Sequence, residues 1–343
     1  MASLTHEEDR AILGSRLERA NPCPVPSQKV ISNQMLDSTQ ALSHERPSGE
    51  RFSGHESFAC RYGWLPKFYE LLARTPDAVR HDEEVMVALG IGRNMVKSVR
   101  FWAQAFGLME DVPRQAPIPT PFAHWLLDRG KGADPYLEDV GSLWLLHWRL
   151  VSTAHLAAWE VAFFETPERE ILRRFLIQKV ERRAAELEKR LSANTIRQHV
   201  DIFLNCYATP LAATTQSVEE ALACPLQELG LIRINPAGDR DELIEFARGP
   251  WRHLSTGTFL KILLDYWQLR APHDRTLTLR ALLTDFASPG LTLRLDEMTL
   301  WQTLAEIGQK HSDLIEISDS AERRAIVLRA TDIATAKARI GYV

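Results

Sequence analysis

The sequence predicts a mainly α-helical protein with winged helix-turn-helix elements and short β-hairpin wings. In Arg61–Arg74 the apolar residues recur at offsets of three and four, which is the spacing of an amphipathic helix. A Gly-x-Gly turn at Gly90–Gly92 joins two further helical segments. In the last third of the chain, helical segments are twice followed by two short apolar strands with turn residues between them. Together these patterns indicate helices and small hairpins and give no sign of a large sheet.

The composition limits the classes of function. The chain has 343 residues, which favours two to three structural units, and its apolar content of 45% is typical of a globular protein. Lys and Arg number 41 and Asp and Glu number 45, so the formal charge is −4. This balance excludes nucleic-acid binding through bulk positive charge. Any DNA contact must come from a local basic face.

Cysteines and apolar runs bear on cellular location. No C-x-x-C pair occurs, which argues against a zinc site. Scattered cysteines and the absence of a secretory leader in Met1–Ala20 predict reduced thiols and a cytoplasmic protein. No run approaches about 18 uncharged apolar residues, so no membrane partner is expected. The cysteines are Cys23, Cys60, Cys206 and Cys224.

We expect four segments along the chain. Thr5–Arg19 has the pattern of an N-terminal helix, and the Pro- and Ser-rich residues up to Gly54 predict an extended arm. The predicted segments are 1–53 for the helix and arm, 54–130 for a helix-turn-helix domain, 131–210 for a helical middle domain and 211–343 for a winged-helix-like C-terminal region.

The helix-turn-helix is assigned from caps and turn residues. The expected elements are, in order, a helix Arg61–Arg74, a short helix capped by Asp82 and ending at Leu89, a turn at Gly90 and Gly92, a helix from Arg93 to about Phe106, a C-cap at Gly107, and a strand or wing within 108–121.

The helix from Arg93 carries a basic and amide stripe. At roughly 100° per residue, its polar residues fall within about 60° of one another, and none of them is acidic. Arg and Lys can contact guanine and phosphates, and Gln can contact adenine, so the stripe suits a recognition helix in a major groove. A solvated helix face is the alternative. The stripe consists of Arg93, Lys97, Arg100 and Gln104, and we also count Lys67 and Asn94 as candidate DNA contacts.

Helices and hairpins are expected in the rest of the chain. Trp125, Trp144 and Trp148 are expected in a core because aliphatic residues surround them. The predicted helices are Phe122–Leu127, Asp139–Leu150, Leu156–Glu165, Pro167–Leu191, a helix capped by Ser192 and running through Cys206, Glu219–Gly230, Thr278–Ala287 and Asp296–Lys310. The predicted strands are Leu231–Ile234, Leu243–Phe246, Leu314–Ile317 and Ala325–Leu328.

The segment that opens at Gly54 could carry chemistry. No phosphate-binding loop, dinucleotide fingerprint or nucleophile elbow occurs, so no nucleotide cofactor is expected. Cutting a phosphodiester needs a base or a metal-bound water and a cation for the developing charge, and His55, Glu56 and Arg61 are of these types. The alternative is structural, with Glu56 capping the next helix or pairing with Arg61 and His55 bonding to the backbone. Three carboxylates on the next element could help to hold Mg²⁺ or another divalent cation: Asp82, Glu83 and Glu84.

Two motifs carry a family resemblance. Gly54-His55-Glu56-Ser57-Phe58, followed by Arg61-Tyr62-Gly63-Trp64-Leu65, and then Leu89-Gly90-Ile91-Gly92-Arg93-Asn94-Met95-Val96, resemble a prokaryotic domain family of uncharacterised function. The members of this family include SspB of DNA phosphorothioation systems. The resemblance extends from about Phe52 to the C-terminal region.

The resemblance implies a function and partners. It implies a DNA-binding component of a phosphorothioation and phage-defence system that nicks one strand so that the backbone can be modified. The implied partners are double-stranded DNA, a cysteine desulfurase, an ATP-using sulfur transferase and an ATPase, and a homodimer is left open. The rival hypothesis is a non-enzymatic DNA-binding adaptor or transcriptional regulator, so enzyme activity as a nicking endonuclease stays undecided at this point.

Overall fold

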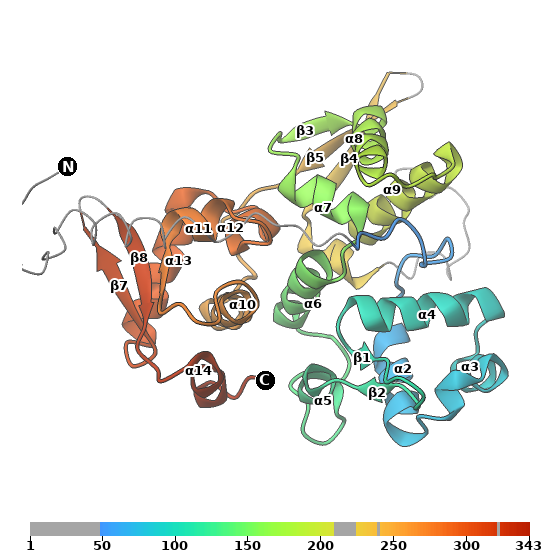
Figure 1. Ribbon diagram of the computed structural model, residues 1–343, viewed down its shortest axis with the longest axis horizontal. Helices are drawn as coiled ribbons and strands as arrows, with labels where there is room; N and C mark the ends of the chain where they lie inside the picture. The colour runs from blue at the N-terminus through green and yellow to red at the C-terminus, as the bar shows by residue number, and fades with distance from the viewer. Residues whose placement is uncertain (1–48, 209–223, 239–240, 321–322) are drawn as a thin grey trace, which may run out of the picture. The chain divides into compact units, whose positions relative to one another are not determined.

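The protein is described by a computed structural model in which residues 49–208, 224–238, 241–320 and 323–343 are described. These residues belong to one compact unit that spans residues 44–343 (Figure 1). The predicted helix Thr5–Arg19 and most of the predicted arm lie outside the described residues. The described part is mainly helical with small antiparallel sheets, as predicted. No described helix is both long and apolar enough to cross a membrane.

The first group of elements contains the predicted helix-turn-helix. Its elements are α2 (Trp64–Arg74), η1 (Ala78–Arg80), α3 (Asp82–Leu89), α4 (Arg93–Ala105), β1 (Met109–Glu110), β2 (Ile118–Pro119) and α5 (Pro121–Leu127). Gly90 adopts a φ of 66° after α3, which is why the short turn before α4 is possible. Strands β1 and β2 pair antiparallel. The expected strand or wing after the second helix is therefore a small hairpin.

Two details of this group correct the prediction. The first helix begins at Trp64 and not at Arg61, because Gly63 adopts a left-handed conformation with a φ of 78°. Asp82 is the first residue of α3 and not its N-cap, which is His81. The apolar face of α4 agrees with the helical wheel, since Val96, Val99 and Trp102 are buried.

The middle group surrounds a three-stranded antiparallel sheet with strand order β3-β5-β4. Its elements are α6 (Val140–Thr153), α7 (Ala157–Phe164), β3 (Glu170–Leu172), α8 (Arg173–Glu186), α9 (Ala193–Tyr207), η2 (Pro225–Leu229), β4 (Ile232–Ala237) and β5 (Asp241–Phe246). The predicted cap Ser192 is observed, and Asp139, predicted as the first residue of a helix, is the N-cap of α6. The tryptophans of α6, Trp144 and Trp148, are buried in the core as expected.

The predicted helix Pro167–Leu191 is wrong at both ends. Residues 170–172 form β3, in which Ile171 pairs with Ile244 of β5, and α8 ends at Glu186. Of the predicted helix Glu219–Gly230, residues 219–223 lie outside the described residues. Within 225–229 the chain forms the 3-10 helix η2, which begins at Pro225.

The last group repeats the order of the middle group around a sheet with strand order β6-β8-β7. Its elements are α10 (Thr256–Arg270), β6 (Thr276–Thr278), α11 (Leu279–Thr284), α12 (Pro289–Thr292), α13 (Glu297–Lys310), β7 (Ile315–Asp319), β8 (Arg324–Leu328) and α14 (Ile333–Arg339). The hairpin β7–β8 was predicted. Helix α10 was not, because it is apolar on most sides and shows little periodicity.

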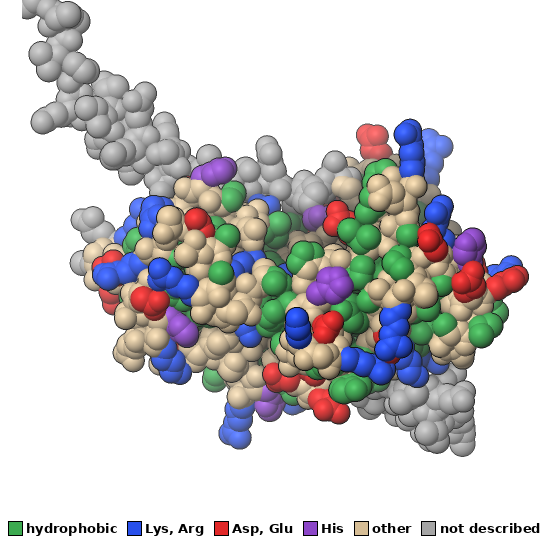
Figure 2. Space-filling model, turned by 90° about the horizontal axis from the view of Figure 1, so that it is seen from below, with side chains coloured by type: hydrophobic (Ala, Val, Ile, Leu, Met, Phe, Trp, Pro, Cys, Tyr) green, Lys and Arg blue, Asp and Glu red, His purple; other side chains and the backbone are tan. Residues whose placement is uncertain are grey.

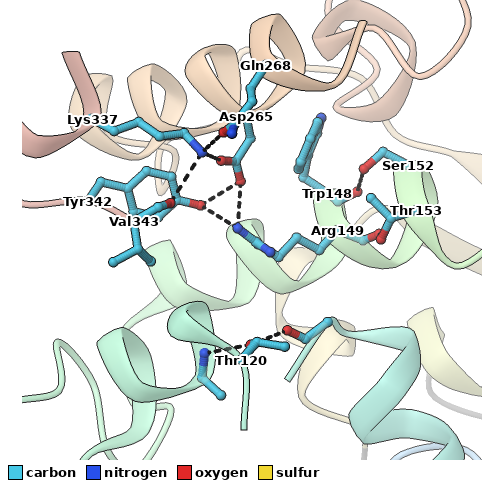
Figure 3. A network of polar contacts seen from close by, with 12 residues as sticks. Thr120, Trp148, Arg149, Ser152, Thr153, Asp265, Gln268, Lys337, Tyr342 and Val343 are labelled. Carbon is cyan, nitrogen blue, oxygen red and sulfur yellow. Dashed lines mark hydrogen bonds and ion pairs between the residues drawn. The ribbon is translucent and has the colours of Figure 1, made fainter. Parts of the chain in front are cut away.

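A buried polar cluster joins the first, middle and last groups (Figure 3). The carboxylate of Asp265 on α10 accepts bonds from Lys337 of α14 at 2.6 Å, from Arg149 of α6 at 3.0 Å and from Tyr342 at 2.6 Å. The Arg149 guanidinium also lies 3.7 Å from the ring centroid of Phe122 on α5. This Asp265 cluster therefore fixes helices that are more than a hundred residues apart in the sequence.

Surface charges agree with the near-neutral composition. On the face in Figure 2, acidic and basic side chains are interspersed and neither sign dominates. Many of them form exposed ion pairs, such as Arg329 with Glu316 at 3.1 Å. DNA binding would thus depend on a local surface, as the composition indicates.

Candidate nucleic-acid interface

The segment from Gly54 to Phe58 forms a tight reverse turn, which we call the 54–58 turn. The amide of Phe58 donates to the carbonyl of His55 at 3.1 Å. Glu56 and Ser57 between them both have positive φ, at 54° and 86°. Side chains rarely adopt this conformation, which costs of order 1–3 kcal/mol per residue and concentrates at functional sites. The turn presents the exposed side chain of Glu56.

Helix α4 holds the 54–58 turn from one side. The carbonyl of Phe58 accepts a bond from Trp102 Nε1 at 3.0 Å and from Ser98 Oγ at 3.4 Å. A Cβ added at Gly54 would lie 2.8 Å from the ring of Phe101, so only glycine permits this approach. The turn and α4 are thus closely packed.

Helix α9 of the middle group holds the turn from the other side. His55 and His199 are buried and stack with ring centroids 5.3 Å apart, and Gln198 donates a hydrogen bond from Nε2 to Ser57 Oγ. In Figure 1 the blue segment that contains the turn lies between α4 and α9. Two helices about a hundred residues apart in the sequence therefore shape the same turn.

A chain of hydrogen bonds fixes the protonation of the two imidazoles. The amide of Ala158 donates to His199 Nε2 at 3.1 Å, so this nitrogen carries no proton. Neutral His199 therefore has its proton on Nδ1 and donates it to His55 Nε2 at 3.0 Å. The proton of His55 then resides on Nδ1, a buried atom without a partner among the described residues. Each imidazole is held in one tautomer.

Burial keeps both imidazoles neutral. Burial lowers the pKa of His55 to about 4. Burial and the neighbouring His55 hold the pKa of His199 well below its usual range. With 3% of its surface exposed, His55 cannot reach a phosphodiester at the protein surface. Its position suits a residue that supports the turn, and Glu56 is the exposed member of the predicted pair.

Arg61 lies on the same loop and contacts aromatic rings. Its guanidinium is 5.9 Å from the ring centroid of Phe58 and 5.7 Å from that of Trp64, and the residue is half-buried. A guanidinium in this setting is held in place by cation–π contacts. The alternative roles predicted for Glu56 are not found, since α2 has no side-chain cap and Glu56 forms no ion pair with Arg61 among the described residues.

Some residues of the predicted stripe on α4 are exposed, and others are held by partners within the protein. Arg93, Asn94 and Lys97, in the first turns of the helix, are exposed. Arg100 instead pairs with Asp82 and donates to the carbonyl of Val79 at 2.5 Å. The hydrogen bond from Arg100 lowers the pKa of Asp82.

The two other predicted DNA contacts, Gln104 and Lys67, do not lie in the exposed first turns of α4. Gln104 donates to Asp111, the first residue of the β1–β2 connection. Lys67 is exposed on α2, at the wall of a cavity of about 350 Å³ that Arg74 and Arg129 also line. The residues that remain available for DNA on α4 are therefore Arg93, Asn94 and Lys97.

Potential metal ligands do not gather. Within the described residues, no group of three or more His, Cys, Asp or Glu side chains is arranged to hold a metal ion. Asp82 is engaged by Arg100, while Glu83 and Glu84 are exposed on α3. Cys60, Cys206 and Cys224 are buried free thiols. Among the described residues, Glu56 thus has no group of other potential metal ligands around it.

The sequence matches the family described as "Protein of unknown function (DUF4007)" over residues 52–340. The chain belongs to the DUF4007 family. No match was found among curated proteins. Two solved structures are similar to this DUF4007 chain. A magnesium ion-bound SspB has a TM-score of 0.72 and 31% identity, over 82% of this chain and 83% of that one. A second SspB structure has a TM-score of 0.71 and 31% identity, over 82% and 84%. The resemblance predicted from the two motifs is confirmed.

His199 and Gln198 of the DUF4007 chain were missed from the sequence. They lie on a helix that was predicted, but their contact with the turn spans more than 140 residues. One signal was present: the helical period places His199 on the apolar face of α9, where a polar residue needs a buried partner. Nothing in the helical pattern indicates that this partner is His55.

Proposed function

We propose that this chain binds double-stranded DNA through the exposed residues of α4 and cuts one strand at the 54–58 turn, as a component of a DNA phosphorothioation system. The similarity to SspB supports the system. One observation supports the activity: a strained turn that packs on α4, the helix with the basic face, presents Glu56 to solvent. Phe101, against which the turn packs, lies one helical turn after Lys97 and on the same side of α4.

The order of elements supports the DNA-binding part of the proposal. Helices α2, α3 and α4 are followed by the hairpin β1–β2, which is the order of a winged helix. In helix-turn-helix proteins the second helix of the motif enters the major groove with its N-terminal residues on the bases. Arg93, Asn94 and Lys97 occupy these N-terminal positions of α4.

The residues of the turn suit hydrolysis of a phosphodiester. Glu56 would act as the base and accept a proton from a water molecule. The oxygen of that water molecule would attack phosphorus, while the bond from phosphorus to one sugar oxygen breaks. Arg61, steadied by two rings, would offset the charge that develops on the phosphate. His55 would act as a positioning residue, because it is buried and bonded to His199.

A divalent cation fits this site only if DNA supplies some of its ligands. Mg²⁺ keeps several waters and is commonly held by one or two carboxylates together with substrate phosphates. Glu56 would be the protein ligand, since no larger group of potential ligands gathers among the described residues. When bound, the cation would supply further positive charge at the phosphate.

A supercoiled-plasmid assay with and without Mg²⁺ tests the proposal. We expect the wild-type protein to convert supercoiled to open-circular DNA. Glu56→Gln should nick at least about 100-fold more slowly while binding DNA equally well, because only the base is removed. The matched control is Glu84→Gln, the same change at an exposed carboxylate of α3. Equal loss in both variants, or full activity of Glu56→Gln, would exclude Glu56 as the base.

The second candidate function is a non-enzymatic adaptor or regulator that recruits partner proteins to DNA. The absence of a three-ligand group among the described residues favours it. In that case the protein binds DNA and never produces open-circular plasmid under either condition. On either account the proposed partners are the desulfurase, sulfur transferase and ATPase of the phosphorothioation system.

A further inference from the structure

We propose that α9 is a second DNA-contacting helix, so that one DNA surface runs from α4 across the 54–58 turn to α9. The inference rests on the proposed function and extends its site to the middle group. It assigns DNA contacts to Asn194 and Arg197, neither of which was predicted from the sequence. The arguments are the side chains of α9, its place in the fold and its contact with the turn.

The exposed side of α9 carries amide and basic groups. At roughly 100° per residue, its polar residues fall within a sector of about 100°. Asn194 and Arg197 are exposed in the first turns of the helix. The stripe consists of Asn194, Arg197, Gln198, Asp201 and Asn205, and the opposite side consists of buried residues that include Ile196, Val200 and Phe203. Amide and guanidinium groups are the types that read bases and bind phosphates.

The acidic residue in this stripe has a cationic partner. Asp201 pairs with Arg173 of α8, and Arg173 also pairs with Glu242 of β5 at 2.5 Å. This network of one guanidinium and two carboxylates carries a net charge of −1, and its α9 member, Asp201, lies one helical turn after Arg197. The first turns of α9, where Arg197 lies, present a positive and hydrogen-bonding surface to a phosphate backbone.

Helix α9 occupies the same place in the middle group as α4 does in the first. Each is the last α-helix before the hairpin of its group and follows the preceding helix, α8 or α3, after a short connection, although the 3-10 helix η2 stands between α9 and its hairpin. Helix α13 has this place in the last group, but its exposed residues include Glu297, Glu306 and Met298, the last 71% exposed. Carboxylates repel DNA, so the polar stripe of α9 is not a general property of the repeated fold.

The turn makes the surfaces of α4 and α9 continuous. Ser57 accepts a hydrogen bond from Gln198, one residue beyond Arg197, and Phe58 accepts one from Trp102 of α4. Glu56 is therefore flanked by the two helices. A strand cut at Glu56 would be held on both sides of the scissile bond, which is how an enzyme positions a long substrate for one cut.

Binding measurements with single-charge variants test the inference. The DNA is a labelled duplex, the readout is fluorescence anisotropy at several salt concentrations, and every variant carries Glu56→Gln so that cutting does not interfere. Arg197→Ala should weaken binding about tenfold and lower the salt slope by about one, the loss of one phosphate contact. Asn194→Ala should weaken binding without changing the salt slope. The control Lys310→Ala removes one positive charge from the exposed end of α13 and should change neither.

The outcomes separate this inference from the proposed function. If Lys97→Ala weakens binding and both α9 variants bind like the parent, the inference fails and the proposed function stands. If the parent protein binds no duplex, both fail. A hydroxyl-radical footprint that shortens on one side only in Arg197→Ala would support the inference independently of affinity, and an unchanged footprint would contradict it.

Discussion

Replacing Asp265 by Asn should strongly destabilise the protein, since Lys337, Arg149 and Tyr342 all contact its carboxylate in the cluster of Figure 3. Asn keeps the size of the side chain but removes its charge. Lys337 and Arg149 would then lose the anion that each contacts, at 2.6 and 3.0 Å. Asp265 and Lys337 are almost fully buried, with side-chain exposures of 5% and 9%.

The magnitude follows from this burial. Breaking a buried ion pair by removing one partner costs about 3–5 kcal/mol, because the remaining charge is left uncompensated. Of the hydrogen bonds that remain to Lys337, the one to Gln268 supplies no charge, and the one to Val343 O is longer, at 3.3 Å, than the 2.6 Å contact with Asp265. We therefore expect the free energy of unfolding to fall by about 3–5 kcal/mol in Asp265→Asn.

Urea unfolding followed by tryptophan fluorescence measures this loss. Tyr342→Phe removes one hydrogen bond to the same carboxylate and should cost about 1.5–3 kcal/mol. Glu316→Gln, in an exposed ion pair with Arg329, is the control and should cost less than about 1 kcal/mol. A loss below about 1 kcal/mol in Asp265→Asn would refute the view that the cluster stabilises the packing of these helices.

Two further predictions concern the stability of the protein, first at acid pH and then after a change at a strained backbone position. Burial lowers the pKa of His55 and of His147 to about 4, below the unfolded value of about 6.5. Stability should therefore be fully present above pH 6.5 and fall by about 1.4 kcal/mol per pH unit for each histidine between pH 6.5 and 4; urea unfolding at several pH values checks this, and His147→Gln should reduce the slope. Gly54→Ala should lower the free energy of unfolding by about 2–4 kcal/mol, because φ is 114° and the new Cβ would lie 2.8 Å from Phe101. In the control Gly49→Ala the new Cβ meets no atom within 4 Å, so thermal melting should give the same melting temperature as the parent.

Local patterns in the sequence predicted the two helices α3 and α4 and the turn between them well. The bounds of α3 and α4 follow from the helical period and from Gly90, which ends α3 in a left-handed conformation. These features depend on neighbouring residues, so a single sequence contains them. Strand β3 was not predicted, for the opposite reason: it has three residues, and its partner β5 lies about seventy residues later.

Side-chain partners explain why the predicted site changed. The helical wheel placed Arg100 on the exposed side of α4, but it could not show that Asp82 lies within reach of it. Likewise, His55 reads as an available base in the sequence and is buried against His199 in the fold. Residue type predicts what a side chain can do, whereas its partners decide whether it is free to do it.

The two imidazoles extend the cap of a helix to the 54–58 turn. The amide of Ala158 lies in the first turn of α7, where amides have no partner within the helix, and Leu156 supplies no side-chain cap. His199 accepts a hydrogen bond from this amide at Nε2 and donates one from Nδ1–H to His55, so a chain of hydrogen bonds connects the first turn of α7 to the 54–58 turn. The beginning of α7 and the shape of the turn are consequently linked, and a change of His199 would be felt at both.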